Sequence, residues 1–211
     1  MKPGTPRHDR PGSAAERRKM RVLGVDPAAA GPTGYGVVET DGRNCRMLRF
    51  GALPARSGSF PARLREIHAL IARLIKEYSP DGVAVESVFT ALNMKTALKL
   101  AEVRGVVLLA AAQGNVPVHS YSPREVKASV AGYGHAGKHQ MQLMVRALLG
   151  MKETPEPADA ADALAVALCH IQAAGARARL AAAGAARANG ARPEKPGTRG
   201  PFRVPRIPVV R

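Results

Sequence analysis

The chain has 211 residues, enough for one medium-sized domain with tails. It holds only two cysteines, Cys45 and Cys169, which excludes a disulfide scaffold and fits a reducing compartment, so we expect a cytoplasmic protein. The longest wholly apolar run, residues 106–112, is far too short to span a bilayer. The formal net charge of +16 favours polyanionic partners, either nucleic acid or an anionic surface.

Charge and composition divide the chain into three parts. Residues 1–20 carry a net charge of +4 in a polar segment with Pro and Gly, so we expect a disordered basic extension. Residues 21–172 also carry +4, but they alternate apolar and polar stretches as a folded domain does. Residues 173–211 carry +8 in an Ala-, Arg- and Pro-rich tail that we expect to be mostly disordered.

The first half of the folded part predicts strands joined by a hairpin, followed by a helix. Asp41 and Gly42 form a typical hairpin turn between two apolar runs. Pro61 opens a helix in which apolar residues recur at spacings of three and four as far as Tyr78. The expected strands are residues 21–25, 33–39, 45–52 and 83–85.

The second half predicts four further helices and one more strand. Ser122 and Glu125 form a capping box that begins a helix, and Gly105 is expected to interrupt an earlier one. The expected helices are residues 92–113, 123–132, 138–149 and 158–172, the last extending at most to about Leu180, and the strand is 116–121. Strands that alternate with helices after a hairpin predict an α/β domain with a mixed five-stranded sheet and helices on both faces.

Four acidic residues stand in apolar surroundings. Asp26 and Glu86 end two predicted strands, and Asp159 and Asp162 share one face of the last helix. Strand ends meet at one edge of such a sheet, where several carboxylates repel one another unless a cation lies among them. Oxygen ligands suit Mg²⁺ or Mn²⁺, and two such ions cleave phosphodiesters. Taken singly, Asp26 could instead begin a turn and Asp159 could be an ordinary helix N-terminal charge.

The motifs together resemble one family of nucleases. The segments LGVDP, TGYGVV, AVESVF, ALKLAEVRGVVL, GYGHAGKHQMQLMVRALLG and PADAADALAVALCH occur in that order over residues 20–172 and resemble the RuvC family of Holliday-junction resolvases. The resemblance implies a ribonuclease-H-like fold and a homodimer with two Mg²⁺ ions per active site, for which Mn²⁺ can substitute. It implies symmetric nicking of four-way junction DNA, in partnership with the branch-migration proteins RuvA and RuvB.

The resemblance also assigns roles to individual residues. It implies that the metal-binding catalytic carboxylates are Asp26, Glu86, Asp159 and Asp162. It places Lys127 and Lys138 near the scissile phosphate as catalytic and DNA-binding lysines. Further DNA contacts are expected from Phe89, which would stack on bases, and from Asn93, Lys95 and Arg104. The helix expected at 92–113 is a candidate for part of the dimer interface.

One loop departs from the family pattern. The family follows the first aspartate with Pro-Gly-Ser, whereas this chain has Ala at residues 28–30 and one extra residue before Thr33. We therefore expect activity whose efficiency and metal preference could differ. Two alternatives remain open on the sequence: another ribonuclease-H-like nuclease that acts on structured RNA, and a non-catalytic junction-binding protein.

Overall fold

The computed structural model describes residues 19–55, 58–87 and 93–188. Within them, strands and helices follow the order expected from the sequence. The strands are β1 (Met20–Asp26), β2 (Thr33–Thr40), β3 (Cys45–Leu53), β4 (Gly82–Glu86) and β5 (Val118–Tyr121). The helices are α1 (Phe60–Tyr78), α2 (Met94–Gln113), α3 (Pro123–Ala131), α4 (Lys138–Leu148) and α5 (Ala158–Ala188).

The strands form one mixed sheet in the order β3-β2-β1-β4-β5. The pairs β1–β2 and β2–β3 are antiparallel, whereas β4 pairs in parallel with both β1 and β5. The Oδ1 atom of Asp41 accepts hydrogen bonds from the backbone N–H groups of Arg43 and Asn44, both at 2.7 Å, which closes the predicted hairpin turn. The predicted mixed five-stranded sheet is therefore confirmed.

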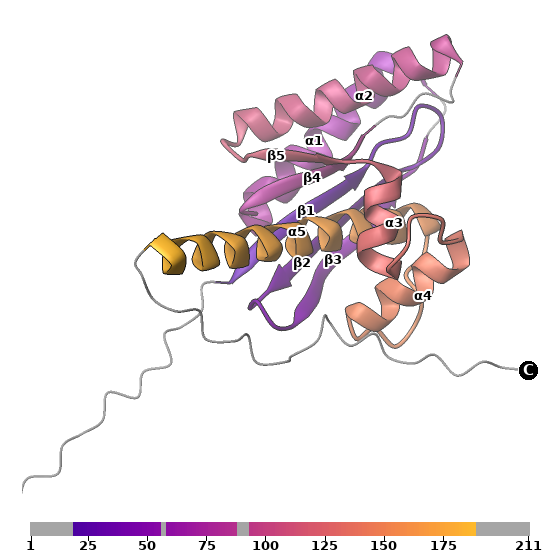
Figure 1. Ribbon diagram of the computed structural model, residues 1–211. Helices are drawn as coiled ribbons and strands as arrows, with labels where there is room; N and C mark the ends of the chain where they lie inside the picture. The colour runs from indigo at the N-terminus through magenta and orange to yellow at the C-terminus, as the bar shows by residue number, and fades with distance from the viewer. Residues whose placement is uncertain (1–18, 56–57, 88–92, 189–211) are drawn as a thin grey trace, which may run out of the picture.

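Helices cover both faces of the sheet (Figure 1). Helices α1 and α2 pack on one face over a core that includes Leu23, Val25 and Val85. Helices α3, α4 and α5 pack on the other face, where Val22 and Ala84 are buried. Because side chains alternate along a strand, each strand contributes to both cores, as expected for a sheet covered on two sides.

Three glycines allow α5 to lie directly on the sheet. A Cβ atom at Gly24 would lie 2.1 Å from the carbonyl oxygen of Ala163, and one at Gly34 would lie 1.9 Å from that of Asp159. A Cβ atom at Gly36 would lie 2.6 Å from the side chain of Leu164. Only glycine permits these approaches, so β1 and β2 fix the height of α5 above the sheet.

Two helices differ from the prediction. Helix α2 runs through Gly105 without a break, because burial of Val103 and Val107 on either side holds the helix while Gly105 faces outward. Helix α5 continues to Ala188, well beyond the predicted end at residue 172 and beyond Leu180. Alanine, the best helix former, dominates this stretch, so the helix persists where we expected disorder.

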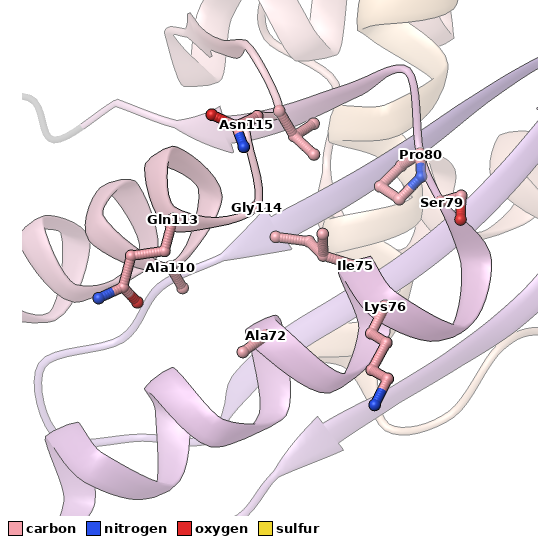
Figure 2. Close-up of a pocket in the computed structure, with 10 residues that line it drawn as sticks. Ala72, Ile75, Lys76, Ser79, Pro80, Ala110, Gln113, Gly114 and Asn115 are labelled. Carbon is pink, nitrogen blue, oxygen red and sulfur yellow. The ribbon is translucent and has the colours of Figure 1, made fainter.

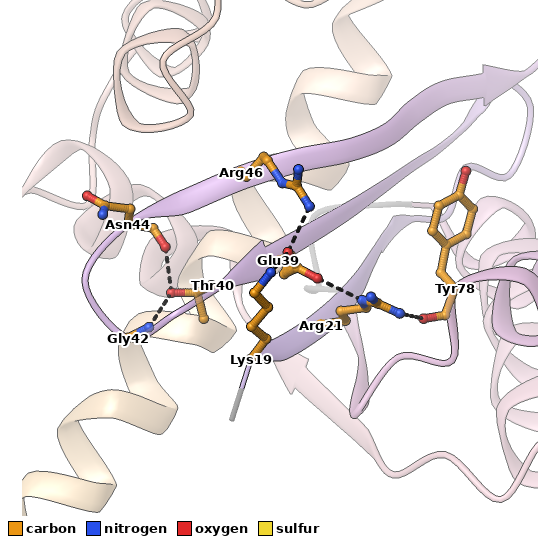
Figure 3. Close-up of polar contacts among 8 residues, drawn as sticks. All are labelled: Lys19, Arg21, Glu39, Thr40, Gly42, Asn44, Arg46 and Tyr78. Atoms are coloured by element: carbon orange, nitrogen blue, oxygen red, sulfur yellow. Dashed lines mark hydrogen bonds and ion pairs between the residues drawn. The ribbon is translucent and has the colours of Figure 1, made fainter. Parts of the chain in front are cut away.

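The end of the sheet opposite the carboxyl ends of β1 and β4 carries a cavity and an ion-pair cluster. The cavity, of about 530 Å³, lies between the C-terminal ends of α1 and α2 and is lined by Ile75 and Gly114 (Figure 2). In the cluster, the buried Glu39 pairs with Arg21 and Arg46, both at 2.9 Å, and with Lys19 at 3.6 Å (Figure 3). These contacts tie β1, β2 and β3 together.

In the described part of the chain, none of the helices is apolar over a length sufficient to cross a membrane.

Candidate active site

Asp26 and Glu86 lie side by side at the ends of adjacent parallel strands. Val25 of β1 is paired with Val85 of β4, so the residue that follows each is a neighbour of the other. Val22 and Ala84 belong to the core under α5, and strand alternation places Asp26 and Glu86 on that same face. The two side chains are within hydrogen-bonding reach of each other.

The N-terminal turns of α5 bring two further carboxylates to Asp26. Gly34 is the antiparallel partner of Asp26, and the backbone of Asp159 lies directly over Gly34. Asp162 follows one helical turn later on the same face of α5. The negative charges of both Asp159 and Asp162 act on Asp26. The close packing of α5 on glycine thus assembles the carboxylates that the sequence predicted.

Two lysines reach the same place from α3 and α4. Strand β5 ends beside Glu86, and the predicted capping box of Ser122 and Glu125 begins α3 immediately afterwards, which carries Lys127 over the site. Lys138 is the first residue of α4, and its Nζ lies 3.6 Å from Oδ2 of Asp162. A pocket of about 210 Å³ is lined by Glu86, Pro123, Val126, Lys127, Lys138, Met141, Asp162 and Ala165.

Burial and mutual repulsion perturb these carboxylates. Burial first, and then the charges of Glu86, Asp162 and Asp159, raise the pKa of Asp26 to about 8. Burial and the charge of Asp162 raise the pKa of Glu86, against the opposing effects of its hydrogen bond with Asp26 and of Lys127. Burial also raises the pKa of Asp162, although Lys138 opposes it. The pocket therefore holds more negative charge than it stabilises on its own, as active sites commonly do.

The donor set of the pocket fits a hard divalent cation. All four candidate ligands are carboxylates, which Mg²⁺ and Mn²⁺ prefer, and a bound cation would relieve the repulsion that raises the pKa of Asp26. Across residues 19–55, 58–87 and 93–188, no group of three or more His, Cys, Asp or Glu side chains forms a finished metal site as it stands. The carboxylate oxygens that a cation needs are present, and the side chains would have to move closer together to bind it.

Among the remaining predicted DNA contacts, Asn93, Lys95 and Arg104 do not line this pocket. Phe89 lies outside the described residues. Asn93 caps α2, its Oδ1 accepting a hydrogen bond from the backbone N–H of Thr96 at 2.9 Å, and Lys95 is exposed in the first turn of α2. Arg104 donates from Nη2 to Oγ of Ser120 at 2.6 Å. The structure thus gives Asn93 and Arg104 roles within the fold, and their contacts with DNA stay predictions.

Arg63 contacts the loop that follows Asp26, a role that the sequence does not predict. Its guanidinium donates hydrogen bonds to the carbonyl oxygens of Ala28, Ala29 and Gly31. Nothing in the sequence marks this contact, because backbone carbonyls carry no residue-specific signal and the partners are 32 to 35 positions apart.

Comparison with known proteins identifies the family of this chain. The family model for crossover junction endodeoxyribonuclease RuvC matches residues 22–170. The chain belongs to the RuvC family. The matched span includes all four carboxylates and both lysines of the pocket. Residues after 170, including the last turns of α5, lie beyond the RuvC match.

Individual RuvC proteins support this assignment. The crossover junction endodeoxyribonuclease RuvC of Syntrophomonas wolfei is 46% identical over 154 residues, which cover 72% of this chain and 88% of that protein. The protein of the same name from Chloroflexus aggregans is 49% identical over 152 residues, covering 72% and 92%. The structure of Thermus thermophilus RuvC in complex with Holliday junction substrate has a TM-score of 0.68 at 38% identity and covers 72% and 92%. The predicted ribonuclease-H-like fold and the predicted family are confirmed.

Proposed function

We propose that this protein is a Mg²⁺-dependent endonuclease that resolves four-way DNA junctions by paired, symmetric nicks. The observation that carries the proposal is that two carboxylates and two lysines line one pocket, in a chain of the RuvC family: Glu86, Asp162, Lys127 and Lys138. The charges of Glu86, Asp162 and Asp159 also act on Asp26 beside it. Phosphodiester hydrolysis needs a cation-holding carboxylate cluster and positive groups beside the phosphate. The pocket supplies both kinds of group.

The carboxylates would bind the metal ions, and the lysines would position the phosphate. Asp26, Glu86, Asp159 and Asp162 would hold two Mg²⁺ ions, or Mn²⁺ in their place, and the ions when bound supply an activated water and stabilise the leaving oxygen. Asp26 holds a proton at neutral pH in the metal-free pocket, in hydrogen-bonding reach of Glu86, and must release it before the ligand set carries its full charge. Lys127 and Lys138 orient the scissile phosphate at the mouth of the pocket.

A homodimer would present two such pockets to one junction. Helix α2 exposes an apolar stripe, which we define as Met94, Leu98, Gly105 and Leu109, with Met94, Leu98 and Leu109 exposed to 74%, 57% and 52%. Among the described residues, no atom lies within 4 Å of the position of a Cβ at Gly105, so a second helix could approach closely there. A two-fold dimer matches the two-fold symmetry of a four-way junction.

Phe89 and the basic residues complete the proposed DNA contacts. Phe89 would stack on bases near the junction centre, while Lys95 and Arg104 would contact the backbone beside Asn93. We also propose that the protein works with RuvA and RuvB in the cytoplasm, where its two free cysteines stay reduced.

A junction-nicking assay with Asp26→Asn tests this function. The purified protein should nick a labelled synthetic four-way junction at two opposed strands in Mg²⁺ and not in EDTA. Asp26→Asn should lower the rate by at least about a thousandfold, because one ligand and its charge are lost, while the junction is still bound. The exposed and distant Arg65→Ala is the matched control and should cut normally. Nicking by Asp26→Asn at the wild-type rate would refute the site.

The same assay separates the two alternatives. A preference for structured RNA over junction DNA would indicate the RNA-processing nuclease. Tight junction binding without any Mg²⁺-dependent nicking by the wild-type chain would indicate a non-catalytic binding protein.

A further inference from the structure

The loop that follows Asp26 is held from the other face of the sheet. Residues 27–32 connect the end of β1 to Thr33 at the start of β2. Arg63, in the first turns of α1, donates from Nη2 to the carbonyl oxygens of Ala28 at 2.7 Å and Gly31 at 2.5 Å. Its Nη1 donates to that of Ala29 at 3.2 Å. One guanidinium therefore binds three carbonyl groups within four consecutive residues.

Apart from the fixed φ angles of its two prolines, the loop has little of its own with which to fix its shape. Its sequence is Pro-Ala-Ala-Ala-Gly-Pro, and none of these side chains can form a hydrogen bond. Arg63 is half-buried, and burial lowers the pKa of its guanidinium, as expected for a cation that contacts carbonyl dipoles away from bulk water. The planar fork of arginine can reach several acceptors at once, which the single ammonium group of lysine does less well.

The hydrogen bonds also set the direction of the loop relative to the pocket. Asp26 faces α5, whereas Arg63 approaches from α1, which covers the opposite face. The carbonyl dipoles of the loop are thus drawn away from the side on which four carboxylates already repel one another. Without Arg63 these carbonyls would lose their donor, and residues 28–31, which the flanking prolines do not fix, could turn them toward the pocket or carry Asp26 with them.

We propose that Arg63 is a positioning residue that holds the loop after Asp26 in place and thereby keeps the Asp26 carboxyl against Glu86 beside the active-site pocket. The inference rests on the proposed nuclease function for its catalytic consequence. The hydrogen bonds themselves do not depend on it. Arg63 does not line the pocket, and its side-chain hydrogen bonds within the described residues go to the loop, so we expect it to act on catalysis through the loop.

Arg63→Ala, Arg63→Lys and the control Arg65→Ala test this role by hydrogen exchange. Arg65 lies on the same helix but is exposed. In metal-free protein, Arg63→Ala should raise amide exchange at residues 26–36 while exchange in α4 and α5 stays as in the wild type. Arg63→Lys should give an intermediate increase, and Arg65→Ala none. Unchanged exchange at 26–36, or an increase spread evenly over the whole chain, would overturn the proposal.

Single-turnover nicking of saturating junction then measures the catalytic consequence. Arg63→Ala should slow nicking by about 10- to 100-fold, the loss expected when a reacting group moves by about 1 Å. Its junction affinity should stay within about twofold, since Arg63 makes no DNA contact in this proposal, and Arg63→Lys should recover part of the rate. A wild-type nicking rate in Arg63→Ala would overturn the positioning role. Failure of the wild-type chain to nick would instead refute the proposed function, with the exchange result still deciding whether Arg63 holds the loop.

Discussion

At the scale of single residues, the charged form of Asp26 lowers the stability of the metal-free fold. Asp26 is half-buried beside other carboxylates, and its pKa of about 8 means that the fold disfavours the charged form. An unfolded chain would ionise this group near pH 4. The folded state therefore becomes progressively less favourable, relative to the unfolded state, as the pH rises from about 4 to 8.

Asp26→Asn should consequently stabilise the metal-free protein. Below about pH 4 the aspartic acid is neutral in both states, so the variant should gain little there. At pH 8 the melting temperature in EDTA should be several degrees higher than that of the wild type, the effect expected when about 1 kcal/mol or more of burial cost and repulsion is removed. Thermal denaturation at pH 4, 6 and 8 measures this. A lower melting temperature for Asp26→Asn at pH 8 would show that the pocket is not a site of stored repulsion. Added Mg²⁺ should raise the melting temperature of the wild type more than that of the variant.

The residues also differ in how far the sequence could reveal them. The sequence predicts Asp26 and Glu86 as site residues because an acid at the end of an apolar strand is unusual, although Asp26 could also begin a turn. The roles of Lys127 and Lys138 are predicted only through the family motifs, since an isolated surface lysine does not indicate a function. Arg63 was not predictable, because its partners are backbone carbonyls of three small residues more than 30 positions away.

At the scale of elements, the contact of α5 with β1 and β2 decides whether the site forms. Local patterns predicted the order of the elements and most of their bounds, because periodicity and caps act over a few residues. They did not predict how closely α5 approaches the sheet, which depends on glycines that meet backbone atoms far along the chain. The end of α5 was also missed, because continued helix and disorder are both compatible with an Ala- and Arg-rich sequence.

Gly34→Ala tests the role of this close contact. Its Cβ would lie 1.9 Å from the backbone carbonyl oxygen of Asp159, and the backbone fixes the positions of both atoms, so the start of α5 must move away from β2. We expect a destabilisation of about 2 kcal/mol or more and a larger relative loss of nicking, because Asp159 and Asp162 move away from Asp26. Gly184→Ala, in the exposed part of α5 where no described atom lies within 4 Å, is the control and should be neutral or slightly stabilising. Denaturant unfolding and nicking assays measure both effects, and normal behaviour of Gly34→Ala would contradict the packing.

The apolar stripe of α2 makes a separate prediction about assembly. Leu98→Glu with Leu109→Glu should convert a dimer to a single chain of 22.2 kDa, because two charges would be buried at the contact while neither leucine is needed in the monomer core. Light scattering after gel filtration measures the mass. Leu180→Glu, on an equally exposed leucine of α5, should leave the mass unchanged. A double variant that keeps the wild-type mass would exclude the stripe as the dimer contact.

At the scale of the whole molecule, the chain combines a RuvC-matching domain at residues 22–170 with a basic segment after it. The RuvC match ends at residue 170, whereas half of the net charge, +8 of +16, lies in residues 173–211. The described part of this segment is the end of α5, where Arg177 and Arg179 are exposed. A positive segment of this kind adds affinity for DNA chiefly by releasing counterions from phosphates, without regard to sequence.

Removal of residues 189–211 should therefore weaken junction binding in a salt-dependent way. The deleted part carries six Lys or Arg and one acidic residue, so the slope of log affinity against log salt concentration should become shallower by about one or more, at about 0.9 per lost phosphate contact. The nicking rate at saturating junction should not change, because no pocket residue is removed. Titrations between about 50 and 200 mM salt measure the slope. A full-length variant with those six basic residues replaced by Gln should match the truncated protein. An unchanged slope in both variants would mean that the added charge does not contact the junction.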